Sequence, residues 1–347
     1  MKSLRSHDLA RDRALGALLG VAIGDAMGMP TQSLNRDQIR ATYGRISDLV
    51  AAASNQPVSA GLAAGTITDD TEQSLLLAAH LIERHGAFDE NAWALALTAW
   101  ERGTRERGIH DLLGPSTKRA IDALARGVPA SETGRHGTTN GAAMRITPVG
   151  LAMPLHPLKR FVERVEETCR VTHNTGEAIG AAAAVAAVVS AGVDGASFED
   201  AIPLAIEAAR MGETCGHGAD PAHLSSRIED ALVLARRAPG IAAVDGIAAK
   251  IGTSVAAVES VPMAFAIARL ADAEAWQAAV VAANIGGDTD TIGAIACGMC
   301  AACAGSAALP QDKVDTVIAI NRLDLGPVVA GLLRLRSRAA ASPEDAP

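Results

Sequence analysis

Two short acidic clusters, far apart in the sequence, carry residues that could bind a metal ion. They read Thr68-Asp69-Asp70-Thr71-Glu72 and Gly286-Gly287-Asp288-Thr289-Asp290-Thr291. In each case a run of small residues leads into an expected helix. Carboxylate and hydroxyl oxygens are hard ligands, of the kind that Mg²⁺ prefers in proteins. A fold that brings the two clusters together would therefore form a site for a divalent cation.

Helix capping is the alternative interpretation of the same residues. Asp69, followed three positions later by Glu72, fits a capping box, and acidic residues in a first turn complement the helix dipole. A cap needs only one oxygen, however, whereas Asp69 beside Asp70 and Asp288 near Asp290 crowd like charges. Their repulsion is costly unless a positive charge lies between them. We therefore prefer a metal site, whose ligands can also start their helices.

The composition indicates an all-α protein. The acidic clusters must therefore be positioned by helices. Of the 347 residues 49% are hydrophobic but only 2% are aromatic, so the core must consist mainly of Ala, Val, Leu and Ile. Small side chains let helix axes approach closely, and Ala has the highest helix propensity. No linker or strand-rich segment is visible, so we expect one domain over residues 1–337. Residues 338–347, rich in Ala, Ser and Pro, are expected to form a disordered tail.

The net charge limits the classes of partner. A formal charge of −8 without clustered Lys and Arg argues against a nucleic-acid surface or an anionic membrane surface, so a small molecule or a protein is the expected substrate. Residues 1–13 are charged and polar, and the apolar run 14–23 is too short to span a bilayer. We expect a cytoplasmic protein, with a monomer as the default state.

Apolar residues recur with helical spacing through most of the chain. The predicted helices cover residues 11–23, 35–43, 72–85, 90–102, 116–126, 158–172, 176–191, 201–210, 224–237, 244–251, 261–270, 276–284 and 291–304. Gly and Pro predict a turn at residues 24–30 and a long loop at 44–66. The helix at 176–191 is apolar all round; Glu177 and its many alanines favour a buried central helix over a membrane span.

Three of the five cysteines are spaced like iron–sulfur ligands. Cys297, Cys300 and Cys303 lie among Ala, Gly, Met and Ile in the predicted helix 291–304. On a helix the three would follow a spiral rather than converge in a loop. We interpret them as small buried core residues, as free cysteines often are.

Five motifs in order give the chain a family resemblance. They are Gly20-x-x-x-Gly24-Asp25-Ala26-x-Gly28, Thr68-Asp69-Asp70-Thr71, Asn140-Gly141-Ala142-Ala143-Met144-Arg145 with Pro148, Thr172-His173, and Gly286-Gly287-Asp288-Thr289-Asp290-Thr291. This set resembles the ADP-ribosylglycohydrolase family, which includes the dinitrogenase reductase activating glycohydrolase. The resemblance extends over roughly residues 15–305, nearly the whole chain.

The resemblance implies a fold, a metal centre and a reaction. The implied fold is a single-domain orthogonal bundle of α-helices, and the implied centre holds two Mg²⁺ or Mn²⁺ ions. The implied reaction is hydrolysis of the glycosidic bond at the ribose anomeric carbon of an ADP-ribosyl group, carried by a protein or by a free conjugate. The metal ligands that match the family are Thr68, Asp69, Asp70, Asp288, Asp290 and Thr291.

Further residues acquire expected roles from the resemblance. Asp288 and Asp69 are the candidates to hold or deprotonate the attacking water. The implied substrate-binding residues are Gln32, Asn140, Gly141, Ala142, Ala143, Met144, Arg145, His173, Gly286 and Gly287. Asn140 and the N–H groups that follow it could bind phosphate or ribose oxygens, or they could simply form an Asn-Gly turn. His173 could bind the same oxygens or interact with a helix dipole, and the two glycines could approach a ligand or only shape a turn.

One position departs from the family pattern. Many relatives carry a glutamate shortly after the first glycine motif, whereas this chain has Gln32 there. An amide keeps the shape and an acceptor oxygen but cannot ionise. Two other functions therefore stay open: an N-glycosidase for another nucleoside or ribosyl metabolite, and a catalytically silent metal-binding relative.

Overall fold

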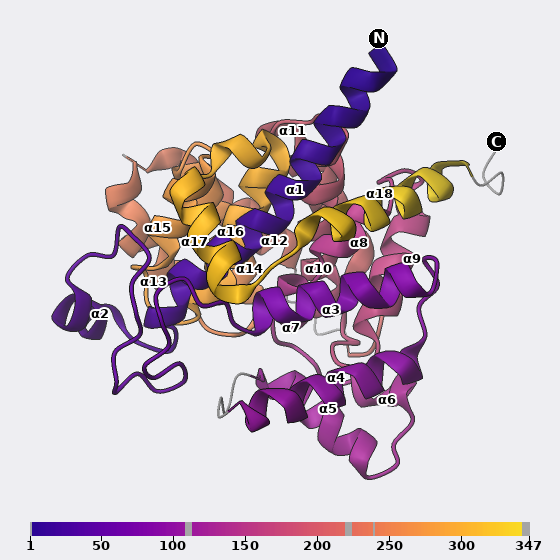
Figure 1. The fold of residues 1–347 in the computed structure, drawn as a ribbon, viewed down its shortest axis with the longest axis horizontal. Coiled ribbons are helices and arrows are strands. Elements are labelled where there is room, and N and C mark those ends of the chain that lie inside the picture. The colour runs from indigo at the N-terminus through magenta and orange to yellow at the C-terminus, as the bar shows by residue number, and fades with distance from the viewer. Residues whose placement is uncertain (1, 108–112, 219–223, 239, 342–347) are drawn as a thin grey trace.

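The computed structural model confirms the all-α prediction. It describes residues 2–107, 113–218, 224–238 and 240–341, and every regular element in these ranges is helical. Extended pairing within them is limited to two isolated bridges, Thr139 with Ala256 and Thr175 with His217. The ribbon in Figure 1 shows helices packed at many different crossing angles, as expected for an orthogonal bundle.

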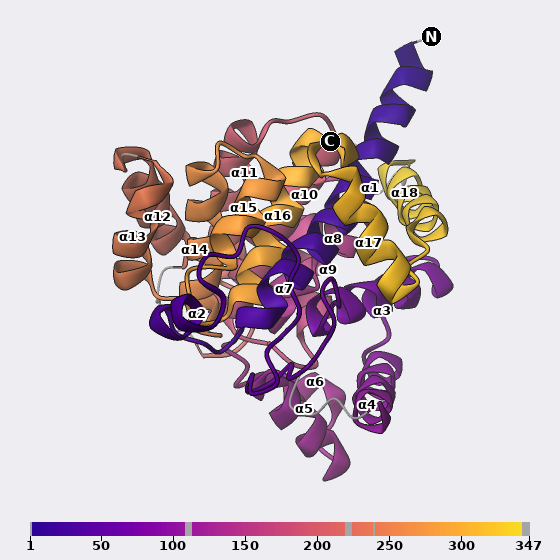
Figure 2. The ribbon, with the colours of Figure 1, turned by 60° about the vertical axis from the view of Figure 1, so that its left-hand side comes forward.

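Helices α1 (Lys2–Gly28) and α16 (Thr289–Ala304) form the most extensive helix contact in the described part of the chain. They run side by side through the middle of the molecule, α1 in indigo and α16 in orange (Figures 1 and 2). The middle of α1, at Gly16, lies against the end of α16, and the end of α1, at Gly28, lies against the start of α16, so the pair is antiparallel. The carboxyl end of α1 therefore lies beside the second acidic cluster.

Glycines at every fourth position of α1 make this contact possible. Gly16, Gly20, Gly24 and Gly28 fall on one face of the helix because residues four apart lie one above the other. A Cβ atom at Gly24 would stand 2.1 Å from the carbonyl oxygen of Gly293 in α16. The backbones therefore touch directly, and a larger side chain at this position would separate the helices.

The turn predicted at residues 24–30 is wrong. Helix α1 continues through Gly28 and is followed by one 3-10 turn, η1 (Met29–Thr31), with Pro30 in its first half. Gly24 and Gly28 suggested a chain break, but they serve close helix packing. Gly is destabilising inside a helix, and here its packing against α16 outweighs that cost.

Helix α10 (Gly176–Val193) is the central buried helix that its apolar sequence predicts. Of its 18 residues, Glu177 alone is not buried. The segments Asp8–Thr31 and Gly176–Val193 are long and apolar enough to cross a membrane, but 94% of each apolar window is buried within the protein. Around α10 pack α11 (Phe198–Gly212), α14 (Ala257–Leu270) and α16.

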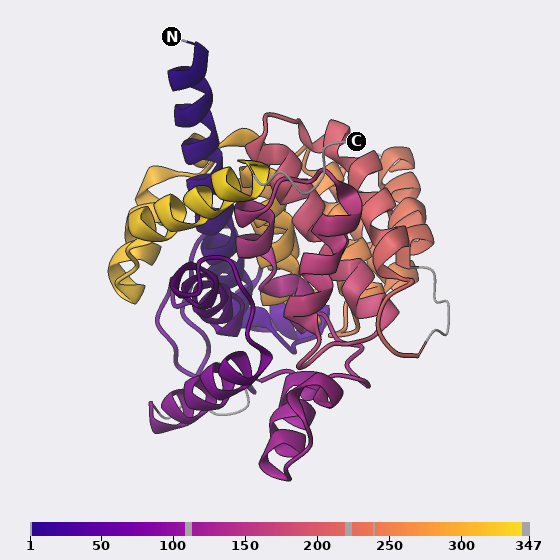
Figure 3. The same ribbon diagram turned by 90° about the vertical axis from the view of Figure 1, so that its right-hand side faces the viewer.

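The remaining helices follow in chain order. They are α2 (Arg36–Tyr43), α3 (Asp69–Glu83), α4 (Glu90–Glu106), α5 (Pro115–Ala125), α6 (Ala130–Thr133), α7 (Gly141–Met144), α8 (Thr147–Ala152), α9 (Leu158–Cys169), α12 (Leu224–Arg237), η2 (Ile241–Ala243), α13 (Val244–Ile251), α15 (Ala275–Ala282), η3 (Ser306–Ala308), α17 (Gln311–Asn321) and α18 (Leu325–Ala341). Helices α4, α5 and α6 lie together at one end of the molecule (Figures 1 and 3).

The carboxyl-terminal helices were missed by the sequence analysis. Helix α18 extends to Ala341, so residues 338–341 are helical rather than part of a disordered tail. Three consecutive alanines favour the helix there, and Arg160 of α9 donates to the carbonyl oxygen of Ala339. The rest of the predicted tail, residues 342–347, lies outside the described residues.

The cysteines of α16 are core residues, in line with their interpretation from the sequence. Cys297, Cys300 and Cys303 are all free and buried. Burial raises the pKa of all three thiols, that of Cys303 to about 12. Neutral thiols of this kind pack as small apolar side chains.

Candidate metal centre

The two acidic clusters come together at the first turns of α3 and α16. One carboxylate oxygen each from Asp69, Asp70 and Asp290 lies within 4.8 Å of the other two. All three side chains are buried, with Asp70 0% and Asp290 2% exposed. The meeting of the clusters is what the sequence predicts.

The electrostatics of this triad favour a cation. Burial, followed by repulsion from neighbouring carboxylates, raises the pKa of Asp69, Asp70 and Asp290 well above the ordinary value. One oxygen of Asp70 and one of Asp290 are buried and have no hydrogen-bond partner in the described residues. Buried polar atoms are normally satisfied, so each orphaned oxygen requires an explanation. A donor set of closely spaced carboxylate oxygens fits a hard divalent ion such as Mg²⁺ or Mn²⁺.

Asp25 of α1 holds the start of α3 in place. Its carboxylate accepts from the backbone N–H groups of Thr68 and Thr71, at 2.9 and 3.1 Å, and from both hydroxyls, at 2.7 and 2.5 Å. Burial raises the pKa of Asp25 to about 6, although these hydrogen bonds lower it. This carboxylate acts as a helix cap supplied from another helix.

The capping box expected within the first cluster does not form. Thr68 is the N-cap residue but makes no capping bond of its own, and Asp69 lies inside the helix. Glu72 instead accepts from Trp100 and Arg107. The sequence motif contains Asp25 but does not predict this capping role. The sequence signal for this role is that Asp25 is the one charged residue in the otherwise apolar and small stretch 14–28.

The two threonines of the predicted ligand set lie at the acidic centre. The hydroxyl of Thr68 donates to Asp25 and lies 3.3 Å from an oxygen of Asp70. The hydroxyl of Thr291 hydrogen bonds with Asp70 and with Asp288. Because the proton of Thr68 is directed to Asp25, a lone pair of its oxygen remains for a cation.

Asp288 lies beside the triad and is the most accessible of the four carboxylates. It is the N-cap residue of α16 and is partly exposed. Burial raises the pKa of its carboxyl, while hydrogen bonds from Asn140 and Thr291 lower it. The side-chain amide of Asn140 donates to Asp288 at 2.5 Å and to the hydroxyl of Ser260 at 3.0 Å. Asn140 therefore fixes the orientation of the Asp288 carboxylate.

The residues that follow Asn140 form a single helical turn, α7, rather than an open loop. Gly141 to Met144 are all buried, which leaves Asn140 as the residue of this motif that reaches the acidic centre. The expected contact of the N–H groups of Gly141, Ala142 and Ala143 with substrate stays a prediction.

Arg145, predicted to bind substrate, is buried behind the centre. It is 1% exposed, donates to the amide oxygen of Gln73 at 2.8 Å and lies over the ring of Trp93. Burial lowers the pKa of its guanidinium to about 10, a value at which it stays charged at neutral pH. The amide nitrogen of Gln73 in turn donates to Asp69 at 3.4 Å. Arg145 thus supports the centre through Gln73.

His173 is also buried, and both of its ring nitrogens are engaged. Its Nε2 lies 2.9 Å from the hydroxyl of Thr139 and its Nδ1 lies 2.8 Å from that of Thr172. Burial and the charge of Arg145 lower the pKa of His173 well below the ordinary value, so the ring is neutral. The geometry favours a positioning role over direct contact with phosphate or ribose.

Gly286 and Gly287 shape the turn that leads into α16. Both have positive φ angles, 77° and 83°. The N–H of Gly287 donates to the carbonyl of Leu34 at 2.9 Å, and a Cβ atom there would stand 2.2 Å from the carbonyl oxygen of Thr253. The two glycines therefore face the protein's own backbone, which favours their turn-shaping role over contact with a ligand.

Gln32, the position that departs from the family pattern, is buried next to the second cluster. The preceding residue, Thr31, shares a hydroxyl hydrogen bond of 3.0 Å with Thr289. Gln32 is 7% exposed, and its backbone carbonyl accepts from the amide of Gln56. Its own amide nitrogen has no partner among the described residues. Such an unsatisfied donor is available to an acceptor on a ligand.

Comparisons with known proteins agree with the fold and with the family resemblance. Residues 6–340 match the sequence pattern of the family described as ADP-ribosylglycohydrolase. The chain is 33% identical over 338 residues to the uncharacterized protein YegU of Escherichia coli, with 95% of this chain and 99% of YegU covered. It is 32% identical over 206 residues to the ADP-ribosylarginine hydrolase Tri1 of Pseudomonas putida, covering 58% of this chain and 52% of Tri1.

A solved structure shares the whole architecture. A chain of an ADP-ribosylglycohydrolase-related protein complex superposes with a TM-score of 0.66 at 27% sequence identity. The match covers 96% of this chain and 99% of that one. The fold assignment therefore rests on nearly the entire length of both proteins.

Proposed function

The chain belongs to the ADP-ribosylglycohydrolase family, and we propose that it hydrolyses the glycosidic bond at the ribose anomeric carbon of an ADP-ribosyl group. The single observation that carries the proposal is the convergence of Asp69, Asp70 and Asp290, with two buried oxygens left without partners. The similarity to Tri1, an ADP-ribosylarginine hydrolase, supports an ADP-ribosyl substrate. Whether the chain is of the dinitrogenase reductase activating type stays a prediction.

We assign two divalent cations, Mg²⁺ or Mn²⁺, to the acidic centre. Oxygens of the three clustered carboxylates, of Asp288 and of the hydroxyls of Thr68 and Thr291 would hold them. Bound there, such ions would orient the ribose hydroxyls and make water more acidic. Buried carboxylates with raised pKa values favour cation binding, because a cation removes the repulsion that holds protons on them.

Asp288 is the proposed general base. It is the most exposed carboxylate of the centre, and the amide of Asn140 holds it in one orientation. In the proposed step a water oxygen forms a bond to the anomeric carbon, and the bond from this carbon to the leaving group breaks. The water proton passes to Asp288, and the leaving group departs with its bonding electrons and takes up a proton. Asp69 is the second candidate for the base, although it is 7% exposed and less accessible.

Gln32 favours a second candidate function within the same chemistry. A neutral amide with an unused N–H donor suits an acceptor atom on the substrate and gives no countercharge to a cationic leaving group such as a guanidinium. The alternative substrate is a nucleoside or another ribosyl metabolite. Replacing Gln32 by Glu separates the cases: a large gain in ADP-ribosyl-arginine hydrolysis would indicate that the native substrate is something else.

The proposal is tested by measuring the turnover of a set of defined substrates. The purified protein is incubated with Mg²⁺ or Mn²⁺ and ADP-ribosyl-arginine, ADP-ribosyl-serine or simple nucleosides, and released ADP-ribose or ribose is measured. Release of ADP-ribose that disappears in Asp288→Asn, but not in Asp37→Asn, is expected. Asp37 is a suitable control because its side chain is 96% exposed on α2. Cleavage of nucleosides without turnover of any ADP-ribosyl compound would favour the second candidate, and no turnover at all would favour a silent relative.

A further inference from the structure

A second cavity lies at the far end of α3 from the metal centre. It has a volume of about 310 Å³ and is formed by the end of α3, by α8, by α9 and by α18. Leu81 of α3 borders it, roughly 16 Å along the helix axis from Asp70 at 1.5 Å per residue. No lining residue of the cavity belongs to the acidic centre, so the two sites are separate.

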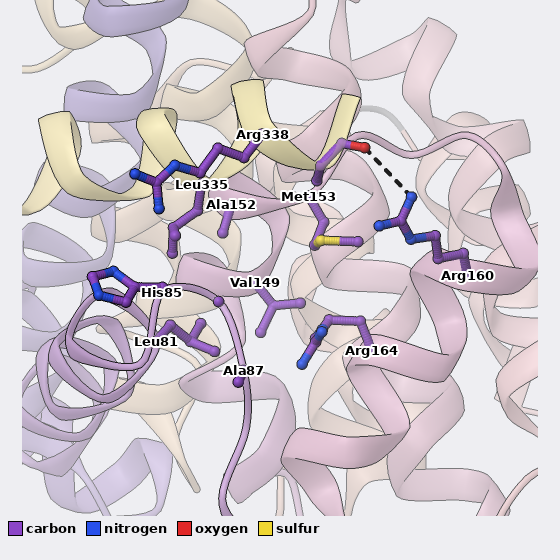
Figure 4. A pocket seen from close by; sticks show the side chains of 12 residues that line it. Leu81, His85, Ala87, Val149, Ala152, Met153, Arg160, Arg164, Leu335 and Arg338 are labelled. Carbon is purple, nitrogen blue, oxygen red and sulfur yellow. Dashed lines mark hydrogen bonds between the residues drawn. The ribbon is translucent and has the colours of Figure 1, made fainter. Parts of the chain in front are cut away.

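The floor of this cavity is apolar. Leu81, Val149 and Ala152 are buried beneath it, and Leu335 of α18 closes it from above (Figure 4). The thioether of Met153 lies in the middle of the view, between the walls. A volume of this size is at the lower end of the range for small-molecule sites, which are mostly apolar with a few polar groups.

The rim of the cavity is cationic. Arg160 and Arg164 border it from α9 on one side, while Arg338 and His85 border it on the other (Figure 4). The lining contains no Asp or Glu, although the chain as a whole has a net charge of −8. Arg164 pairs with Glu167 outside the lining, at 2.7 Å, and Arg160 donates to the carbonyl of Ala339.

Arg338 is the most exposed of the three arginines on the rim. It is exposed in the last turn of α18, one residue before Ala339. A guanidinium is a planar fork of donors that matches a carboxylate or a phosphate. An apolar floor with guanidinium groups around its mouth is complementary to a molecule that is apolar at one end and anionic at the other.

We propose that this cavity is a binding site for a small organic anion with an apolar body, represented by a medium-chain carboxylate. The alkyl part lies over Val149, Ala152 and Met153, and the carboxylate faces Arg338. The proposal does not depend on the proposed hydrolase activity, because the two sites share no residue. It can therefore fail or succeed independently.

Methionine methyl groups give a direct readout of the proposed site. In the full-length protein with ¹³C-labelled methionine methyls, sodium octanoate is added and the spectra are recorded. The resonance of Met153, assigned with Met153→Leu, is expected to shift and to saturate at one octanoate per chain. Met263, fully buried in α14 away from the cavity, is expected to stay unchanged. An unresponsive Met153, or a shift that does not saturate, would overturn the proposal.

Ligand chemistry provides the second test. Affinity is expected to rise roughly fourfold for each added methylene from hexanoate to octanoate, as apolar burial predicts. Octanol and octylamine, which have the same apolar body without an anion, are expected to bind at least about tenfold more weakly. Equal binding of octanoate and octylamine would contradict a role for the arginines.

A matched pair of variants tests the rim. Arg338→Gln is expected to weaken octanoate binding about three- to tenfold, in the range of a partly exposed ion pair. Arg334→Gln serves as the control because Arg334 is exposed on the same helix but does not line the cavity. A similar loss in both variants would show that the effect comes from the overall charge of α18, and the assignment of the carboxylate to Arg338 would be wrong.

Discussion

The carboxylate of Asp25 in α1 accepts hydrogen bonds from both the backbone and the side chain of Thr71 in α3, at 3.1 and 2.5 Å. Two segments separated by 46 positions are joined by this one side chain. The same carboxylate also accepts from Thr68, so a residue that does not belong to the acidic triad fixes the helix that carries two of its members.

We expect Asp25→Asn to destabilise the protein. The amide retains the shape but directs two N–H groups toward a site where four donors converge, so buried donors lose their acceptor. Loss of such a cap and its hydrogen bonds costs about 2 kcal/mol, measurable as a lower denaturation midpoint in urea. Asp37→Asn, on the surface of α2, is the control and should change the midpoint little. Equal stability of Asp25→Asn and the wild-type protein would contradict the capping role.

Replacing one acid of the triad should have opposite effects with and without metal. Asp290→Asn removes a buried acid that the folded protein must either keep protonated or hold as a charge repelled by its neighbours, so the metal-free protein is expected to gain stability at neutral pH. The same change removes a ligand and should weaken Mn²⁺ binding by at least about tenfold. Thermal denaturation in the presence of a chelator measures the first effect, and calorimetric titration with Mn²⁺ measures the second. Unchanged Mn²⁺ affinity would exclude Asp290 as a ligand.

The stability of the metal-free protein should fall as pH rises. Burial and mutual repulsion raise the pKa of Asp69, Asp70 and Asp290 in the folded state, so the folded protein retains protons that the unfolded chain releases. The stabilising contribution is therefore full below the unfolded pKa values and is lost as pH rises through the folded ones. Denaturation midpoints between pH 5 and 8, with chelator and with saturating Mn²⁺, would reveal this dependence.

Bound metal should reverse the pH dependence of stability, because metal binding displaces the protons that the folded protein retains. We expect the apparent Mn²⁺ affinity to rise with pH and proton release to be detected by calorimetry in buffers of different ionisation enthalpy. Metal binding without proton release at pH 6 would contradict the raised pKa values. Asp290→Asn should release fewer protons than the wild-type protein.

Gly24→Ala should be strongly destabilising although it adds a single methyl group. The new Cβ would stand 2.1 Å from the carbonyl oxygen of Gly293, so α1 and α16 would have to separate. Gly103→Ala is the matched control, since Gly103 also lies inside a helix but has open space around its Cβ position. There the higher helix propensity of Ala should stabilise by about 1 kcal/mol. Chemical denaturation of both variants should therefore give shifts of opposite sign.

Local sequence patterns were sufficient to locate most helices. The predicted ranges 224–237 and 244–251 coincide with α12 and α13, because amphipathic spacing there is clear and breaks are sharp. The error at residues 24–30 arose because glycine has two uses that look alike in a sequence: it ends helices, and it lets helices touch. Which use applies depends on α16, whose residues are more than 250 positions away.

For the candidate site, the sequence identified the metal-ligand residues better than the residues that hold them in position. Asp69, Asp70 and Asp290 stand out as crowded acids, and the structure brings them together. Arg145 and His173 were predicted to contact substrate, yet both are buried and bonded to protein groups. In a sequence, a polar or charged side chain that contacts a ligand looks the same as one that positions a ligand-contacting residue. Only burial and hydrogen-bond partners distinguish these roles.

The glycine face of α1 also constrains where the chain can change in length. Inserting or deleting one residue between Gly16 and Gly24 would rotate the rest of the helix by about 100°. Asp25 would then turn away from Thr68 and Thr71, and side chains larger than glycine would meet the backbone of α16. Homologous chains that keep this centre should therefore place their insertions and deletions outside this stretch, for example in the loop at residues 44–66.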